Sequence, residues 1–511
     1  MFVGVGASLL ACASFFFACS SSDSGGTAPG TDAGDESIPT PPGDDGGDAS
    51  ADGGALGAND PKSGTRIEAR YETTSDGAAI FRTLHDKQLD VDCFLHQYDD
   101  GSIRCVPLVN VGIGAYYEAG CTKSVGVVEK VTCADEKTFA LEEMPPPAGS
   151  PNPCAFKSRA YRIGAVVTHV FQKDGSPSGC SEVPLDPQFD AYALGPALAA
   201  SELVGFTLTT DALTPKLGAR VFHGDDGSIG GSLQLVDTAR SKACGIMNGA
   251  DAKPRCLPTT SFHGEGYGES GCGTHVVNDV ACKTNDYTYD DSVALRGEPI
   301  AVADQCQPLG QNNHVDTKGA IRATKDYWSK QDTTCNGPLT SSTDLYDIGA
   351  EVPASTFPEL TLDRRGGTRI QEDVRRESGT IVERTSSAYD TQLGVYCNFA
   401  YAADGKRRCL PSGAGTGLFF ADSQCKNPLG EDTDPCRAAK YVISGEAPAC
   451  NQKTHVYALG AAVDPKTTTF YQSTGPGDCQ QVLNVDGRRT MYAPGAEVDP
   501  TTLAETTLVA R

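Results

Sequence analysis

Cysteine is the residue type in this chain whose number and spacing could support chemistry. The chain has 511 residues and 20 cysteines, and three cysteines spaced by 12 and then 16 residues occur three times. Each trio is followed by three more cysteines, so six cysteines recur in three stretches of about 150 residues. Zinc sites use close pairs such as Cys-x2-Cys, and the sequence contains none. The cysteines therefore predict disulfides and an oxidising compartment, and no metal site.

Eighteen cysteines follow residue 19, and we expect all of them to be oxidised: Cys93, Cys105, Cys121, Cys133, Cys154, Cys180, Cys244, Cys256, Cys272, Cys282, Cys306, Cys335, Cys397, Cys409, Cys425, Cys436, Cys450 and Cys479. The first gap in each six is always 12 residues, which suits a single hairpin, whereas the gaps between pairs vary. The spacing favours sequential pairing, with first joined to second, third to fourth and fifth to sixth. Spacing alone leaves other connectivities open.

The first 18 residues form an apolar segment that precedes Cys19. This segment is short for a spanning helix and suits a signal peptide. Ala18-Cys19 followed by a Ser-rich stretch resembles the lipobox of bacterial lipoproteins, over about the first 20 residues. The resemblance implies that residues 1–18 are removed, that Cys19 carries the lipid anchor, and that the protein is sorted to the outer membrane. Cys12 is a rival acceptor, and an ordinary cleaved signal with free secretion is the alternative.

Residues 19–62 are expected to form a disordered acidic tether. Residues 20–62 are mainly Gly, Asp, Ser, Ala, Pro and Thr, which cannot bury enough apolar surface to offset the entropy of ordering. Nine of the chain's acids lie between Asp23 and Asp60, and the whole chain has a net charge of −24. This charge argues against nucleic acid as a partner, since a basic stripe would be needed to displace its counterions.

The register of the three stretches extends to residues other than cysteine. An Asp lies seven residues before the first Cys of each trio, and an Arg lies directly before the second: Asp86, Asp237 and Asp390, and Arg104, Arg255 and Arg408. Each repeat opens with Arg and an apolar residue, at Arg66, Arg220 and Arg369. A Tyr-x-x-Gly pattern closes each stretch at Tyr192, Tyr346 and Tyr492, and it occurs earlier at Tyr161 and Tyr457.

These patterns predict an all-β protein of three repeats, at residues 63–215, 216–364 and 365–511. Short apolar runs between turn signals predict eight to ten strands per repeat, including a hairpin of residues 92–97 and 103–106 and strands over 166–171, 206–209 and 456–460. The junctions lack Pro/Ser-rich linkers, which favours continuous packing, so we expect a β-propeller of about six blades. Three tandem disulfide-stapled β domains are the alternative.

Motifs of catalytic chemistry are missing. The sequence has no Gly-x-Ser-x-Gly elbow, phosphate loop or His-Glu-x-x-His, so no catalytic residue and no cofactor is assigned. None of the eight histidines is expected at the same place in two repeats. We expect the three repeated Asp residues to hold their own turns rather than calcium, and the Arg before the second Cys to be solvated. The aromatic residues before the third Cys are expected in the core, with a glycan-stacking surface as the alternative.

The repeat resembles that of large lipoproteins of unknown function from Gram-negative bacteria, over roughly residues 63–511. The resemblance rests on the Arg-Cys-Leu-Pro strings at Cys256 and Cys409, the turns before them and the six spaced cysteines. It implies a surface location and no activity. We expect a non-enzymatic, lipid-anchored exported protein at the outer membrane or cell surface that binds a glycan or protein partner. A secreted hydrolase on a propeller scaffold is the alternative.

Overall fold

The computed structural model describes residues 57, 59–133, 137–147, 155–173, 179–260, 262–279, 289–297, 309, 311–331, 334–432, 439–446, 450–464, 468–475, 478–482 and 490–511. These residues form an all-β protein of 36 strands and three 3-10 helices, Ala200–Glu202, Ala354–Thr356 and Pro500–Thr502. This is more strands than the eight to ten per repeat that we expect from the sequence. No helix within these ranges is long and apolar enough to cross a membrane.

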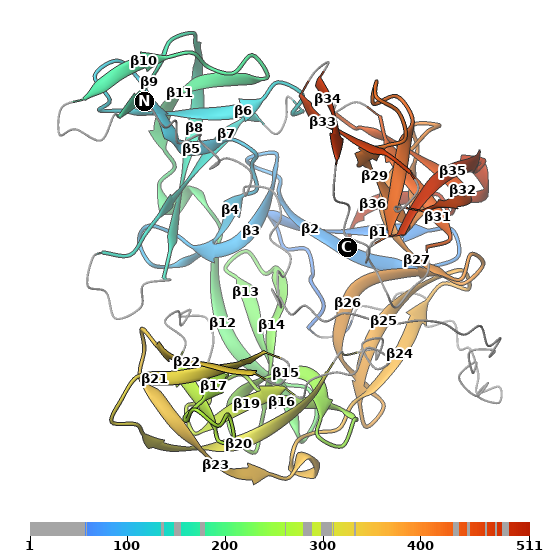
Figure 1. The fold of residues 1–511 in the computed structure, drawn as a ribbon. Helices are drawn as coiled ribbons and strands as arrows, with labels where there is room; N and C mark the ends of the chain where they lie inside the picture. Colours follow the sequence, from blue (N-terminus) through green and yellow to red (C-terminus); the bar gives the residue numbers. More distant parts are fainter. Residues whose placement is uncertain are drawn as a thin grey trace.

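Three antiparallel units, which we call inner sheets 1 to 3, lie toward the middle of the molecule (Figure 1). Inner sheet 1 comprises β36 (Thr506–Ala510), β1 (Ile67–Thr74), β2 (Ala79–Asp86), β3 (Val91–Gln97) and β4 (Ile103–Pro107). Inner sheet 2 comprises β12 (Gly205–Ala212), β13 (Leu217–Gly224), β14 (Ile229–Asp237), β15 (Lys242–Gly249) and β16 (Pro254–Pro258). Inner sheet 3 comprises β24 (Thr361–Gly366), β25 (Ile370–Glu377), β26 (Thr380–Asp390), β27 (Val395–Ala402) and β28 (Arg407–Pro411).

Three further groups of strands, lobes 1 to 3, lie outside the inner sheets (Figure 1). Lobe 1 comprises β5 (Gly112–Tyr117), β6 (Ser124–Glu129), β7 (Phe139–Met144), β8 (Lys157–Val167), β9 (Val170–Lys173), β10 (Cys180–Val183) and β11 (Phe189–Ala197). Lobe 2 comprises β17 (Phe262–Tyr267), β18 (His275–Asp279), β19 (Val293–Gly297), β20 (Asn312–Ile321), β21 (Asp326–Gln331), β22 (Thr334–Thr340) and β23 (Leu345–Val352). Lobe 3 comprises β29 (Ala414–Phe420), β30 (Pro428–Asp432), β31 (Tyr441–Gly445), β32 (Lys453–Val463), β33 (Phe470–Gly475), β34 (Asp478–Val482) and β35 (Thr490–Glu497).

Alternating apolar residues explain the inner sheets. In β1, Ile67, Ala69 and Tyr71 are fully buried, and the residues between them are partly exposed, as a strand with one covered face requires. The expected hairpin forms between β3 and β4, with Leu95 opposite Cys105 and Gly101 in the left-handed region of the turn (φ 84°). The strand expected over 166–171 is wrong, because β8 ends at Val167 and β9 begins at Val170.

The inner sheets exchange strands at their borders. β12 lies within the first repeat by sequence but pairs with β13, and β36, at the end of the chain, pairs with β1. A backbone β-pairing joins the residue before the second cysteine of each trio to the segment that leads into the following sheet. The pairs are Arg104 with Gly205, Arg255 with Glu359, and Arg408 with Glu505. The first and last strands of the described chain therefore belong to one sheet.

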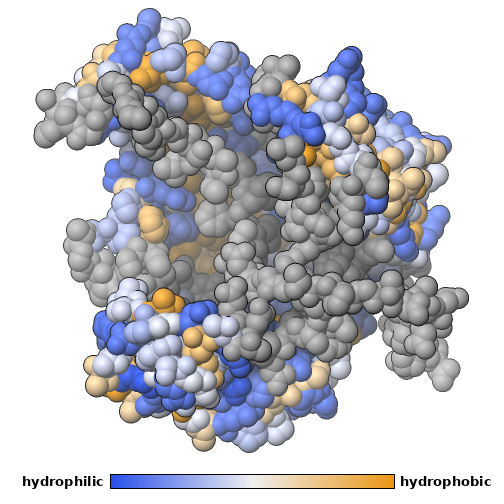
Figure 2. Space-filling view, in the orientation of Figure 1, coloured by the Kyte–Doolittle hydropathy of each residue, from blue (hydrophilic) through white to orange (hydrophobic). Residues whose placement is uncertain are grey.

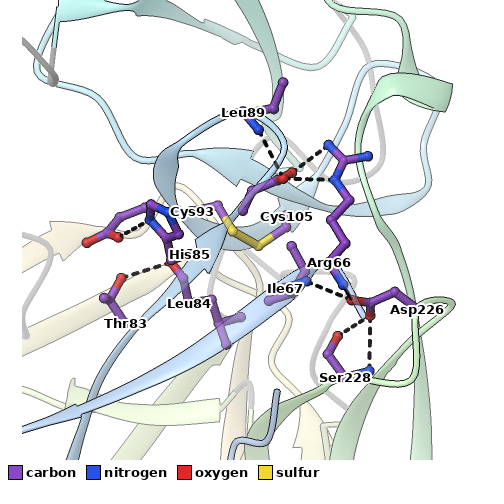
Figure 3. The surroundings of a disulfide bond; sticks show 12 residues. Arg66, Ile67, Thr83, Leu84, His85, Leu89, Cys93, Cys105, Asp226 and Ser228 are labelled. Carbon is purple, nitrogen blue, oxygen red and sulfur yellow. Dashed lines mark hydrogen bonds and ion pairs between the residues drawn. A yellow bond between two sulfur atoms is a disulfide. The ribbon is translucent and has the colours of Figure 1, made fainter. Parts of the chain in front are cut away.

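A carboxylate at the end of β1, β13 or β25 binds the residues that begin one of these strands in a neighbouring inner sheet, and the three contacts form a closed cycle. Asp226 of inner sheet 2 accepts the backbone N–H groups of Arg66 and Ile67 of inner sheet 1, at 2.9 and 2.7 Å (Figure 3). Asp76 of inner sheet 1 does the same for Arg369 and Ile370 of inner sheet 3. Gly64 and Gly367 permit these approaches, because a Cβ at either place would collide with the carboxylate.

The third member of the cycle is Glu377 of inner sheet 3, whose Oε1 lies 3.5 Å from the Nζ of Lys216, the residue just before β13 of inner sheet 2. The register β1–β2 and β13–β14 makes Leu217 the counterpart of Ile67, so Lys216 rather than Arg220 is the counterpart of Arg66. The expectation that the second repeat opens at Arg220 is therefore wrong. Each sheet contacts both others through these carboxylates.

The apolar cores also lie between inner sheets. Phe206 and Phe222 of inner sheet 2 pack with Ile67 and Tyr71 of inner sheet 1. Leu360 and Val382 pack with inner sheet 2, and Ala78 and Ile80 of inner sheet 1 pack with inner sheet 3. Because each cluster needs side chains from two sheets, one inner sheet alone would leave an apolar face uncovered.

Candidate functional site

Asp86, Asp237 and Asp390 hold the turns that follow them, as we expect from the sequence. One oxygen of each carboxylate accepts two backbone N–H groups of its own turn, for example those of Gln88 and Leu89. The other oxygen binds an arginine, Arg66, Arg240 or Arg369, which also donates to a carbonyl of a 3-10 helix. The turn interpretation is confirmed, and these residues are structural.

The arginine before the second cysteine of each trio is structural too. The expectation that it is a solvated strand residue is wrong, because Arg255 and Arg408 are each 4 % exposed. Their guanidinium groups donate to the carbonyl oxygens of Phe357 and Leu503, both at 2.8 Å, and Arg104 donates to that of Leu203. These carbonyls lie where the chain enters the next sheet, so the arginines fasten that entry.

The disulfides follow the expected pattern only at the first pair. The structure joins Cys93 to Cys105 (Figure 3), Cys244 to Cys256 and Cys397 to Cys409, each within one hairpin, as the invariant gap predicts. The third cysteine pairs with the sixth, in Cys121–Cys180, Cys272–Cys335 and Cys425–Cys479, so the sequential pairing of third with fourth and fifth with sixth is wrong. Cys133 pairs with Cys450, 317 residues away, and Cys154, Cys282, Cys306 and Cys436 lie outside the described residues.

Each lobe places two half-buried aromatic side chains directly opposite each other. The pairs are Tyr117 and Phe171, Tyr267 and Trp328, and Phe420 and Tyr471. Residues that face each other across antiparallel strands project from the same side of the sheet. The adjacent third-to-sixth disulfide joins the loop after the first aromatic residue to the strand hairpin that holds the second. The three aromatic pairs are therefore held in place covalently and remain partly accessible.

These pairs correct the expectation that the aromatic residues before the third cysteine are in the core. Phe419 is buried and packs with Phe470, but its neighbour Phe420 is half-buried, as are Tyr117 and Tyr267. On the face shown in Figure 2, hydrophilic and hydrophobic residues are interspersed over the coloured parts of the lobes. Accessible aromatic groups in such a setting suit contact with a partner.

Lobe 2 carries the most elaborate pair, because it contains the only tryptophan of the chain. The Tyr267 ring lies 4.4 Å from that of His275, between centroids. Burial, with the nearby Arg296 cation, lowers the pKa of His275 below its usual value, so this imidazole is neutral at neutral pH. Gly337 lies against the indole, and a Cβ there would be 2.6 Å from Trp328 Cδ1.

The glycines of the Tyr-x-x-Gly pattern let two long strands of each lobe cross closely. A Cβ at Gly164 would lie 2.9 Å from the carbonyl oxygen of Ala193, and one at Gly195 would lie 2.9 Å from that of Arg162. Gly349 in lobe 2, and Gly460 and Gly495 in lobe 3, meet their partner strands in the same way, as does Gly319, which follows Asp316 in place of a tyrosine. The pattern is therefore structural, and it marks the strand pairs β8–β11, β20–β23 and β32–β35.

Two histidines do occupy the same place, contrary to expectation. His314 in β20 and His455 in β32 each follow the residue that pairs with the inner sheet, and their Nδ1 atoms lie 2.7 and 2.6 Å from Glu351 and Glu497. His455 Nε2 also lies 3.1 Å from Glu446, and the hydrogen bond with Glu497, more than that with Glu446, raises its pKa. Arg159 has this place in lobe 1.

Cys19 and Cys12 lie outside the described residues, so the anchor stays a prediction. Within the described ranges, no group of three His, Cys, Asp or Glu side chains could hold a metal ion. Open grooves occur, one of about 390 Å³ that includes Asp76, Arg369, Arg408 and Glu505. Those charged groups are already engaged with one another or with the backbone.

Among known proteins, part of the chain is similar to a family without an assigned activity. A model of a family of unknown function (DUF7481) matches residues 58–302, which is slightly less than half of the chain. The match spans inner sheet 1 apart from β36, the residues just before β1, lobe 1, inner sheet 2 and the start of lobe 2. Neither the curated proteins nor the solved structures gave a match.

Proposed function

We propose that this protein is an exported binding module whose lobes contact a glycan or protein partner. The observation that carries the proposal is the recurrence of a half-buried aromatic pair at the same place in all three lobes, beside a disulfide each time. A fold needs only buried aromatic groups for its core, whereas Tyr and Trp that keep an accessible face are characteristic of interfaces. A polymeric ligand that reaches more than one of these three sites would bind more tightly than a ligand that reaches one site alone.

The anchor and the architecture belong to the same proposal. The lipid acceptor is Cys19, supported by the Ala18-Cys19 junction and the acidic, Ser-rich stretch after it. The three repeats close into one propeller-like ring of inner sheets, supported by the β1–β36 pairing, the cycle of Asp76, Asp226 and Glu377, and the Cys133–Cys450 disulfide. The lobes then point away from the centre, where a ligand outside the membrane can reach them.

A glycan array and a pull-down with a cell-envelope polysaccharide preparation test the binding function. We expect residues 20–511 to retain a subset of glycans, and the emission of Trp328, the sole tryptophan, to change on titration with a retained glycan. Trp328→Ala should weaken retention by roughly tenfold, in line with loss of an aromatic contact at an interface.

Ile321→Ala is the matched control, because Ile321 is an exposed apolar residue of lobe 2 that is not part of the aromatic pair. Retention that is equal for wild type and Trp328→Ala would remove the aromatic pairs from the proposal. Cleavage of a retained glycan during the incubation would instead indicate a hydrolase.

A further inference from the structure

The described chain begins with an arm, residues 59–66, that contacts all three inner sheets. Lys62 exchanges both backbone hydrogen bonds with Ile229 of inner sheet 2, at 2.8 and 2.9 Å. Pro61 accepts the hydroxyl of Tyr71 from inner sheet 1, and the N–H of Ser63 donates to the carbonyl oxygen of Arg511 at 2.7 Å. The last four residues of the expected tether, 59–62, are therefore part of the folded body.

The contact with inner sheet 3 is ionic and secluded. Asp60 Oδ2 accepts from Arg384 Nη1 at 2.7 Å and lies 3.4 Å from Arg365 Nη2. The side chains of Asp60 and Arg384 are only 12 % and 11 % exposed. Arg384 also donates to Glu372, whose side chain is 3 % exposed. An ion pair with so little access to solvent is neither screened by salt nor replaced by water at little cost.

The charges in this place balance only when the arm is present. Arg365 and Arg384 carry two positive charges, and Glu372 supplies one negative charge from the same sheet. Asp60 supplies the second. Without it, a secluded guanidinium would lack an anion, which costs free energy until another anion enters. A guanidinium fork selects carboxylates because it can offer two parallel N–H groups to two oxygens.

We propose that Arg365 and Arg384 form a carboxylate-binding site between inner sheets 1 and 3, and that the arm is a strap that occupies this site through Asp60. A small cavity lined by Gly77, Ala78, Arg365, Glu372 and Arg384 adjoins the pair, and the Oε1 atom of Glu372 in it has no hydrogen-bond partner among the described residues. The strap crosses the border where the first and last strands of the described chain meet, so its occupancy of the site holds that border closed. This inference is independent of the proposed binding function.

Substitution of Asp60 in residues 20–511 tests the strap. Trypsin cleaves after lysine, and the bond after Lys62 is protected while Lys62 pairs with Ile229. We expect Asp60→Ala to raise the cleavage rate after Lys62 by roughly tenfold, as a loss of about 1.4 kcal/mol would. Asp344→Ala removes an exposed ion pair with Lys325 and should leave that rate unchanged.

Small carboxylates test the carboxylate-binding site separately from the strap. Acetate should raise the melting temperature of Asp60→Ala more than chloride at equal ionic strength, because it refills the site, but it should not restore protection after Lys62. Arg365→Ala, which leaves the Arg384–Glu372 pair intact, should also show increased cleavage after Lys62. Acetate should raise the melting temperature of this variant no more than chloride does, because the site has lost one of its two guanidinium groups. Wild-type cleavage in Asp60→Ala would overturn the strap, and equal effects of acetate and chloride on that variant would overturn the carboxylate site.

Discussion

Asp76 and Arg369 are 293 residues apart, and the Asp76 carboxylate accepts the backbone N–H of Arg369 at 2.6 Å. The bond joins the turn after β1 in inner sheet 1 to the start of β25 in inner sheet 3. At the other two borders, Asp226 also accepts a backbone N–H, and Glu377 forms an ion pair with Lys216. Local turns and long-range assembly thus depend on the same few carboxylates.

Asp226→Ala should lower the free energy of unfolding by about 2 kcal/mol, because it leaves two backbone N–H groups without their acceptor. Burial raises the pKa of Asp226, but the N–H of Ile67, the Ser228 hydroxyl and the N–H of Arg66 outweigh it and hold the pKa below its usual value. The carboxylate's contribution is thus present above the unfolded pKa of about 4 and is lost as the pH falls through the lower folded value. Urea denaturation from neutral pH to about pH 3 measures both effects. The difference between the wild type and Asp226→Ala should become smaller toward the acid end, and a constant difference would contradict this assignment.

His455 should titrate above its usual pKa of about 6.5, because Glu497 and Glu446 both stabilise the imidazolium. Since the folded pKa is raised, this stabilisation is complete below the unfolded pKa and disappears as the pH rises through the folded one. NMR of the histidine C–H groups measures the value. Glu497→Gln should return it toward the unperturbed value, and titration of wild-type His455 at or below that value would contradict its pairing with Glu497 and Glu446.

Non-reducing peptide mapping should find Cys121–Cys180, Cys272–Cys335, Cys425–Cys479 and Cys133–Cys450. Removing Cys121 and Cys180 together by serine substitution should destabilise the protein by about 4 kcal/mol, against about 3 kcal/mol for Cys93 and Cys105, because the closed loop is longer. Chemical denaturation compares the two double variants. A peptide that joins Cys121 to Cys133 would restore the sequential pairing.

Residues 63–215 expressed alone should aggregate or stay molten, even when oxidised. The fragment lacks β36, which pairs with β1, and Asp226, which binds the start of β1, so a strand edge and an apolar face are left open. NMR spectra and a thermal scan test this. A soluble fragment with dispersed peaks and its own melting transition would instead support three tandem domains.

Cys19→Ala should release the protein from the membrane fraction and abolish labelling with palmitate. The basis is the Ala18-Cys19 junction after the apolar segment. Fractionation and metabolic labelling measure the outcome, with Cys12→Ala as the matched control. If Cys12→Ala releases the protein and Cys19→Ala does not, the anchor is Cys12.

Sequence spacing predicts contacts within a hairpin better than contacts between strands that a topology brings together. Cys93 and Cys105 flank one turn, so their invariant gap is informative. Cys121 meets Cys180 because β5 lies beside β9, and the residues next to either cysteine do not predict that pairing. The burial of Arg255 has the same origin, since it depends on where Phe357 enters the next sheet.

The equivalence of His314 and His455 could have been found from the sequence. Glu351 and Glu497 both lie in Gly-Ala-Glu-Val strings that follow the Tyr-x-x-Gly pattern, and each histidine precedes a valine in the partner strand. The cycle of carboxylates is harder to predict from the sequence. Glu377 is the last residue of β25 and precedes a shorter turn than those that contain Asp76 and Asp226. The start of β13 was not recognised from the sequence, because Lys216 stands there in place of an arginine.

The pairing of β1 with β36 sets an order of events during synthesis. β1 leaves the ribosome about 430 residues before its partner, so inner sheet 1 cannot be completed until the C-terminus has arrived. The hairpin disulfides can close as soon as each hairpin has formed, whereas Cys133 must wait for Cys450. During that interval β1 presents a free edge that could pair with another chain, so the arrival of the last residues decides when the sheet is complete.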